Sequence, residues 1–403
     1  MADTKQHWLS DVLRWAPATR PDVSQIVAAM LGLAGPIIAG VATDHLRLGM
    51  VAAIGGLALG GAGQGTTLRQ RALALAAALL AGCAAISTGT TIASHGSLVI
   101  LTLPAVAAIA GFFGGISLAM ARETTRFILF TTIAAGLSTP EVRPLGMTLL
   151  FFLGGTWTLG LSLLLHAVFG RAKCAMEPSA AAMQTPTRPV ALLLRRWRES
   201  LFRLSGWQYP MRIWSCLTVA EAIAQIWPGQ HGQWIAVTVA IVLGRRLPAP
   251  PTRLLQRALG TMLGVVIAGL LLIWTPPPLI VTCEIAALAA TRPVLRAGNY
   301  AAYAVVMTPL IVLLLDFGQA ISVAILADRL MATITGCMIT LLFGYLPWPG
   351  NPLRRGRLPS RERGAKPGPS ARSRIHRSAG VSCGDVYSAC ARWSTGLVAR
   401  VRL

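Results

Sequence analysis

The sequence predicts an all-α polytopic membrane protein with about 12 transmembrane helices, arranged as two parallel six-helix repeats. First, 54% of the residues are hydrophobic and only 12% are charged, which is more apolar surface than a soluble chain of this length can bury. Second, the apolar residues form long runs that basic loops separate, as in polytopic helical proteins. Third, residues 70–73 and 256–259 share the sequence Gln-Arg-Ala-Leu, which indicates an internal repeat.

The apolar runs fall into two blocks of six. They lie near 24–41, 48–64, 72–92, 98–120, 127–137 and 145–168 in the first block, and near 213–228, 232–244, 256–274, 279–291, 300–315 and 329–347 in the second. A helix that crosses a bilayer needs about 20 residues, so 127–137, 232–244 and 279–291 are short. We expect these three helices to be tilted, broken or extended into neighbouring polar turns.

The two blocks and their surroundings define four regions. We predict a first membrane block at 1–168, a basic cytoplasmic linker at 169–212, a second membrane block at 213–349 and a disordered basic cytoplasmic tail at 350–403. The linker contains RPVALLLRRWRESLFRL, which is typical of an amphipathic helix on a membrane surface. The tail is rich in Arg, Gly, Ser and Pro and has no apolar periodicity, as in disordered segments.

The basic residues concentrate in alternate loops, which predicts the orientation of the chain. The loops 65–71, 121–126, 169–212, 244–255 and 291–299 all contain arginine. By the positive-inside rule these loops are cytoplasmic, so we expect both termini to lie in the cytoplasm. Arg47, Arg143 and Arg329 break the rule and are therefore candidates for function. The net charge of +22 comes mainly from these loops and from the tail at 350–403, and no amphipathic basic stripe with interleaved aromatics indicates nucleic-acid binding.

The repeat extends beyond the shared tetrapeptide. The same offset places Arg143 over Arg329 and His45 over His231. Because six helices return the chain to its starting side, the two repeats would be parallel, as in transporters whose binding site lies near the repeat interface. Chance similarity between two sequences rich in Ala and Leu is the alternative interpretation.

Four arginines are candidate substrate ligands. Arg71 and Arg257 stand where the third helix of each block enters the membrane, and Arg143 and Arg329 stand at the outer end of each sixth helix. A guanidinium group binds a carboxylate through two parallel hydrogen bonds, which suits an organic anion. The alternatives are a topology anchor that reaches the lipid headgroups for the first pair and local pairing with a nearby acid for the second.

Two acidic residues lie inside apolar runs and are candidate proton-coupling groups. Glu221 occurs in LTVAEAIAQIW and Glu284 in VTCEIAALAA. A carboxylate at membrane depth is costly and normally faces protein or water, and burial favours its neutral form, which suits a group that binds and releases a proton. The alternative is a structural carboxyl that bonds to a neighbouring helix, and this reading is favoured for Glu284.

Other patterns argue against a catalytic or metal-binding protein. The sequence has no P-loop, no dinucleotide fingerprint, no Gly-x-Ser-x-Gly and no His-Glu-x-x-His motif, so we expect no enzyme and no cofactor. The seven cysteines form no Cys-x-x-Cys pair, and no metal site or disulfide framework is predicted.

Glycines recur at a spacing of four. Gly56-x-x-x-Gly60, Gly111-x-x-x-Gly115 and Gly260-x-x-x-Gly264 predict close packing of helix backbones. A hinge near 60–65 is the alternative for the first of them.

Several short motifs in the second block carry a family resemblance. They are Gly232-Gln233-Trp234, Arg257-Ala-Leu-Gly260-Thr261 with Gly264, Asn299-Tyr300 before Thr308-Pro309, and Asp328-Arg329. With these motifs the second block resembles the fusaric acid resistance family, which includes bacterial aromatic acid exporters and is similar to plant aluminium-activated malate channels. Two departures are the lack of a large soluble domain, and Ala74 and Leu75 where the second block has Gly260 and Thr261.

The resemblance implies a secondary transporter of the bacterial inner membrane that exports organic, often aromatic, carboxylate anions and is coupled to protons. An organic-anion channel and a non-transporting envelope component are the alternatives. The expected partners are a small organic anion and the lipid bilayer, with no nucleic acid. The sequence leaves open a periplasmic partner protein or a homo-oligomer.

Overall fold

The computed structural model describes residues 15, 23–60, 67–136, 143–174, 190–227, 232–245, 250–272, 277–315 and 323–348. Within these ranges the regular structure is helical and contains no strand. The predicted tail at 350–403, the alternative hinge beyond Gly60, and His231 lie outside the described residues.

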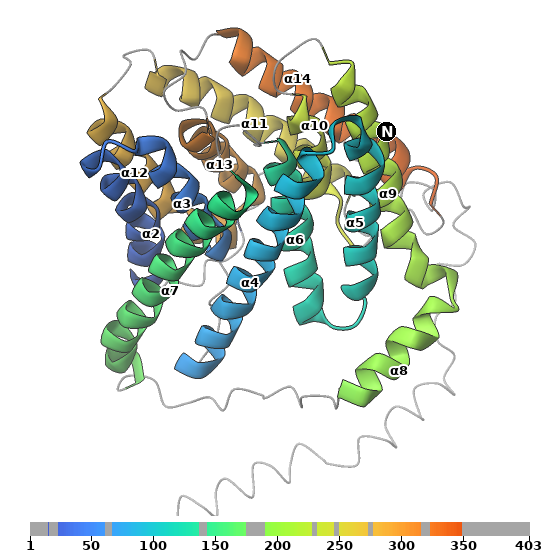
Figure 1. Ribbon diagram of the computed structural model, residues 1–403, viewed down its shortest axis with the longest axis horizontal. Coiled ribbons are helices and arrows are strands. Elements are labelled where there is room, and N and C mark those ends of the chain that lie inside the picture. The colour runs from blue at the N-terminus through green and yellow to red at the C-terminus, as the bar shows by residue number, and fades with distance from the viewer. Residues whose placement is uncertain are drawn as a thin grey trace, which may run out of the picture. The chain divides into compact units, whose positions relative to one another are not determined.

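Six long helices precede the linker helix in the described part of the chain (Figure 1). They are α2 (Val23–Ala42), α3 (Leu46–Leu59), α4 (Leu68–Ala93), α5 (Val99–Phe113), which follows the short helix η1 (Gly96–Leu98), α6 (Leu118–Gly136) and α7 (Pro144–Cys174). Each of the six corresponds in order to one apolar run of the first block. The linker helix is α8 (Val190–Leu201).

Six further helices follow α8. They are α9 (Leu204–Gln225), α10 (Gln233–Val242), α11 (Pro250–Leu272), α12 (Pro278–Gly298), α13 (Tyr300–Leu315) and α14 (Val323–Ile339), which continues as the π-helix η2 (Thr340–Tyr345). Six described helices are long and apolar enough to cross a membrane, namely α2, α4, α5 with η1, α7, α12 and α14 with η2. The all-helical membrane class is therefore confirmed, whereas the count of 12 spans in two repeats stays a prediction.

Two of the three short apolar runs lie in helices that extend into polar sequence. Helix α6 begins at Leu118, where the hydroxyl of Ser117 accepts a hydrogen bond from the Met120 amide at 3.1 Å, as an N-cap does. Arg126 pairs with Glu123 one turn earlier at 2.6 Å, so charged residues join the helix. Helix α12 likewise continues past its apolar run to Gly298.

Helix α10 remains short and is buried on almost every side. It has 10 residues, and Trp234–Ala240 and Val242 are all buried. Its counterpart by position in the first block, α3, is also short and is buried continuously from Ala52 to Leu59. Helices buried on all sides need no lipid-facing stripe, which explains why both read as continuous apolar runs. These two helices form the centre of the core.

Helices from the two blocks exchange partners. Helix α12 of the second block packs along α2 of the first, and α5 of the first block packs along α9 of the second (Figure 1). Contacts within the blocks also correspond, since α4 packs on α6 and on α7 while α11 packs on α13 and on α14. The core is therefore shared between the blocks, and neither block contains all the partners of its own helices.

Glycines permit the closest helix contacts, as their spacing predicts. A Cβ atom at Gly260 would lie 2.6 Å from the Ala304 Cβ, and one at Gly264 would lie 2.6 Å from the Thr308 Cβ. The prediction of close packing is therefore confirmed for α11 against α13. An even closer approach joins α3 and α7, where a Cβ at Gly154 would overlap the Ala52 carbonyl oxygen.

The predicted amphipathic linker helix is present as α8. Leu192 and Leu194 are exposed on it, together with the ion pair of Arg195 and Glu199. The Trp197 indole donates a hydrogen bond to the Phe112 carbonyl oxygen at 2.9 Å and its ring stacks on Phe113. One tryptophan thus attaches α8 to the end of α5, while leucine and arginine side chains stay available to a membrane surface.

Candidate functional site

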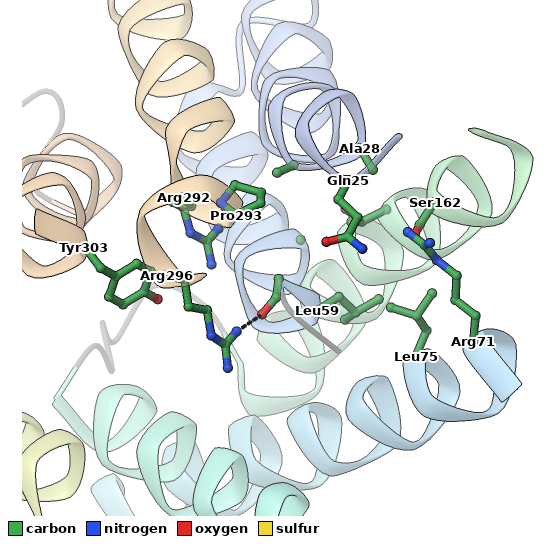
Figure 2. A pocket seen from close by; sticks show the side chains of 14 residues that line it. Gln25, Ala28, Leu59, Arg71, Leu75, Ser162, Arg292, Pro293, Arg296 and Tyr303 are labelled. Atoms are coloured by element: carbon green, nitrogen blue, oxygen red, sulfur yellow. Dashed lines mark hydrogen bonds between the residues drawn. The ribbon is translucent and has the colours of Figure 1, made fainter. Parts of the chain in front are cut away.

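A cavity of about 200 Å³ lies between helices of both blocks. We call it the basic cavity because three arginines line it. Its lining residues are Gln25, Ala28 and Ala29 of α2, Gly56 and Leu59 of α3 with Gly60, Arg71 and Leu75 of α4, Thr158 and Ser162 of α7, Arg292, Pro293 and Arg296 of α12, and Tyr303 of α13. Figure 2 shows Arg71 and Ser162 on one side and Arg292, Arg296 and Tyr303 on the other.

Arg71 is held on the first-block side of the basic cavity. Helix α4 begins just before it, because the Thr67 hydroxyl accepts a hydrogen bond from the Gln70 amide at 3.2 Å. The Arg71 guanidinium donates to the Ser162 hydroxyl from Nε at 3.3 Å and from Nη2 at 3.0 Å. Its Nη1 lies 3.1 Å from Nδ1 of His166. The side chain is only 3% exposed, so it points into the protein and does not reach out to lipid headgroups.

Two arginines of α12, Arg292 and Arg296, form the opposite side of the basic cavity. From the sequence they were predicted only to lie in a cytoplasmic loop. Arg292 donates from Nη2 to the Leu57 carbonyl oxygen at 3.2 Å, and Arg296 donates from Nη1 to the Gly60 carbonyl oxygen at 3.0 Å. Both acceptors lie at the C-terminal end of α3, where cations are favoured by the helix dipole and by free carbonyl groups. The arginines of one block thereby cap a helix of the other.

Arg292 also has donor groups that the protein does not use. It is 6% exposed, and its Nε and Nη1 atoms are buried with no hydrogen bond to the described residues. An unsatisfied buried donor costs about 1–3 kcal/mol, and more when it is charged. A carboxylate bound in the cavity would satisfy these donors. The spacing of Arg292 and Arg296, one helical turn apart beyond a short apolar run, is the sequence signal that points to this side of the cavity.

A second pocket lies within the second block. It has a volume of about 20 Å³ and is lined by Trp234 and Thr238 of α10, Arg257 and Thr261 of α11, Thr308 and Ile311 of α13, and Arg329 and Thr333 of α14. We call it the threonine pocket. The Arg329 guanidinium carbon lies 3.8 Å from the centroid of the Trp234 ring, a cation–π contact.

The four predicted arginines therefore separate into three places. Arg257 and Arg329 meet at the threonine pocket, whereas Arg71 lines the basic cavity. Arg143 is exposed just before α7 and lines neither. The sequence offset equates Arg143 with Arg329, but Arg329 lies about two turns inside α14 and is 4% exposed.

The two predicted acidic residues lie away from both pockets. Glu221 is 7% exposed in α9, and Glu284 is partly buried in α12. The Oε2 atom of Glu284 is buried without a hydrogen-bond partner among the described residues. Neither residue lines the basic cavity or the threonine pocket.

Two other arginines, Arg212 and Arg245, have structural partners. Arg212 of α9 is 1% exposed and donates to the carbonyl oxygens of Gly344 and Gly244, while its guanidinium stacks on the Tyr345 ring at 4.5 Å. Arg245 donates to the Gly111 carbonyl oxygen and stacks on Tyr209 at 4.6 Å. These contacts fasten helix ends to one another, so burial of an arginine is not by itself a sign of ligand binding.

The comparisons with known proteins agree with the family resemblance. Residues 217–343 match the family described as fusaric acid resistance protein-like, which includes every helix that lines the threonine pocket and the part of α12 and α13 that lines the basic cavity. No curated protein and no solved structure shows significant similarity to the chain. The match and the apolar helices together indicate a multi-pass membrane protein.

Proposed function

We propose that the protein exports small organic carboxylate anions across the bacterial inner membrane. The proposal starts from the match of residues 217–343 to the fusaric acid resistance protein-like family. The observation that carries this proposal is the basic cavity, in which arginines of both blocks face one space. Guanidinium groups are the side chains best suited to bind carboxylates, since each offers two parallel donors.

The size and lining of the basic cavity favour a small aromatic acid. Its volume of about 200 Å³ is below the range of about 300–1,000 Å³ that is typical of sites for drug-sized ligands. Leu59, Leu75 and Tyr303 give it an apolar and aromatic wall, and Arg71 and Arg292 stand where a carboxylate would bind. This arrangement suits a single ring with an acidic group better than a large multidrug substrate.

The cavity also lies where an exporter must collect its substrate. Gly60 follows the end of α3, Arg71 is in the first turn of α4, and Arg292 and Arg296 are in the last turns of α12. The positive-inside orientation assigns these three helix ends to the cytoplasmic side. In that orientation the substrate enters the basic cavity from the cytoplasm, and the arginines concentrate the anion there.

We also propose that the two blocks are parallel six-helix repeats, an arrangement found in some secondary transporters. The corresponding contacts of α4 with α6 and of α11 with α13, and the exchange of α5 and α12, support it. Proton coupling is assigned to Glu221, a carboxyl buried within an apolar helix; Glu284 is the second candidate. Alternating access then requires α12 to move relative to α3, because their contact closes the cavity on one side.

The experiment that tests the function measures efflux of radiolabelled benzoate from proteoliposomes that contain the purified chain. We expect efflux to accelerate when the outside is made acidic, because inward proton flow would drive the anion out. Flux that follows the membrane potential and ignores the pH gradient would support an anion channel instead. If neither benzoate nor other small carboxylates move above the rate of empty liposomes, the proposal fails and the envelope-component alternative takes its place.

Glu221→Gln tests the coupling group. The amide has nearly the same shape but carries no exchangeable charge, so we expect gradient-driven benzoate efflux to fall to the rate seen without a gradient. Glu199→Gln in α8 is the control, because Glu199 is exposed and pairs with Arg195 on the protein surface; this variant should keep the full response to pH. An unchanged response in Glu221→Gln would exclude Glu221 from coupling.

A further inference from the structure

We propose that the threonine pocket is a binding site for one small inorganic anion of the halide class. The site is distinct from the basic cavity, since the two share no lining residue. The inference does not depend on the proposed transport of organic anions.

Three unused donors line the threonine pocket. They are Nε of Arg257, Oγ1 of Thr261 and Nε1 of Trp234, and each is buried without a hydrogen-bond partner among the described residues. The side chains are 7%, 2% and 8% exposed, respectively. Buried polar groups in folded proteins are nearly always paired, so three unpaired donors around one space indicate a missing acceptor.

Arg257 brings a positive charge to the pocket, and none of the described residues that line it is acidic. A buried charge is costly unless an opposite charge or good hydrogen bonds accompany it. Arg329, the second arginine of the lining, lies over the Trp234 ring in the cation–π contact. An anion between the three donors would compensate the charge of Arg257, whereas a water molecule would add no charge.

Two further hydroxyls of the lining have already donated their protons. The Thr308 hydroxyl donates to the Ala304 carbonyl oxygen at 3.0 Å, and the Thr333 hydroxyl donates to the Arg329 carbonyl oxygen at 2.9 Å. These two hydroxyls therefore donate nothing to a guest. The donors of Arg257, Thr261 and Trp234 remain unused, and a guest that satisfies all three must be an acceptor.

The volume selects the class of anion. The pocket measures about 20 Å³, and by the same measure a single water needs about 10–15 Å³. One chloride ion fits such a space, whereas an aromatic ring does not. Since the donors are neutral or singly charged N–H and O–H groups, a monovalent halide matches them better than a multiply charged phosphate.

The test is equilibrium binding of ³⁶Cl⁻ to the purified chain in detergent, with gluconate as the replacement anion. We expect saturable binding of one chloride per chain. Thr261→Val removes one donor with almost no change of shape and should weaken binding about tenfold, as expected for a lost hydrogen bond to a charged partner. Trp234→Phe removes the indole N–H donor together with part of the ring system but keeps an aromatic face for Arg329, and should weaken binding at least as much.

Thr132→Val is the matched control. Thr132 is 2% exposed like Thr261, but its hydroxyl donates to the Ile128 carbonyl oxygen at 2.8 Å in α6, far along the chain from the pocket. This variant should bind chloride like the wild type. Size-exclusion profiles in gluconate will show whether each variant is folded before chloride is added.

Three results would overturn the proposal. The first is that the folded wild-type chain shows no saturable chloride binding. The second is that Thr261→Val and Trp234→Phe bind chloride as tightly as Thr132→Val. The third is that benzoate displaces chloride one for one in simple competition. The last result would mean that the pocket holds the carboxylate of the organic substrate. Absence of benzoate efflux together with intact chloride binding would contradict only the proposed transport function.

Discussion

Arg292→Gln is expected to lower benzoate efflux by about 10- to 100-fold, measured as kcat/KM in proteoliposomes. Glutamine is shorter than arginine and carries no charge, and a hydrogen bond to a charged group contributes about 1.5–3 kcal/mol. The buried Nε and Nη1 atoms of Arg292, which have no partner among the described residues, are the donors that this change removes. Most of the loss should come from weaker substrate binding in the basic cavity.

Two further variants separate binding from folding. Arg126→Gln removes an arginine that pairs with Glu123 in α6 and lines neither pocket, so its efflux should match the wild type. Arg292→Lys keeps the charge but not the planar pair of donors, and should fall between wild type and Arg292→Gln. Equal rates for Arg292→Gln and Arg126→Gln, at equal amounts of folded protein in the membrane, would exclude Arg292 from the substrate site.

Gly154→Ala is expected to destabilise the protein by about 3 kcal/mol or more, at the upper end of overpacking effects. A methyl group at this position of α7 would overlap the carbonyl oxygen of Ala52 in α3. Since the obstacle is backbone, no side-chain rotation relieves it, and the two helices must separate. We expect a large fall in the melting temperature measured by fluorescence-detected size exclusion, and little folded protein at 37 °C.

Gly160→Ala, about two turns further along the same helix, is the control. No other residue approaches the position that its Cβ would occupy, so alanine should leave the melting temperature unchanged or raise it, because alanine favours helix by about 1 kcal/mol over glycine. If both substitutions changed stability equally, helix propensity and not the contact of α3 with α7 would govern this region.

The positions of the helices could be predicted from the sequence because a bilayer requires long apolar runs and favours basic residues in the cytoplasmic loops between them. The ends of α6 and α12 could not, since their charged residues are held by partners such as Glu123 and the α3 carbonyls. Glu123 is local to Arg126 in the sequence, but the α3 carbonyls become neighbours of α12 only in the folded protein. Linker helix α8 was predictable because its amphipathic pattern is local, and the exposure of its leucines follows from that pattern.

The candidate site was predictable only in part. Arg71 and Arg257 stand out as a pair in the sequence, but packing directs Arg71 toward Ser162 and Arg257 toward a different pocket. Arg292 was explained in advance by the positive-inside rule, so its spacing of one helical turn from Arg296 was not recognised as a sign of a binding surface. Its position depends on α12 crossing to α2 and α3 of the other block, a tertiary choice that no periodicity records.

The exchange of helices also bears on how the chain is made. Helix α2 is synthesised before residues 43–277, yet the helix that packs along it, α12, follows them. During translation the α12-facing side of α2 must remain against lipid or an insertion factor, and the α9-facing side of α5 must do the same. Completion of the first block therefore waits for the last third of the chain. A protein assembled in this order completes its core only when α9 and α12 pack against the first block. We therefore expect neither half of the chain to function alone.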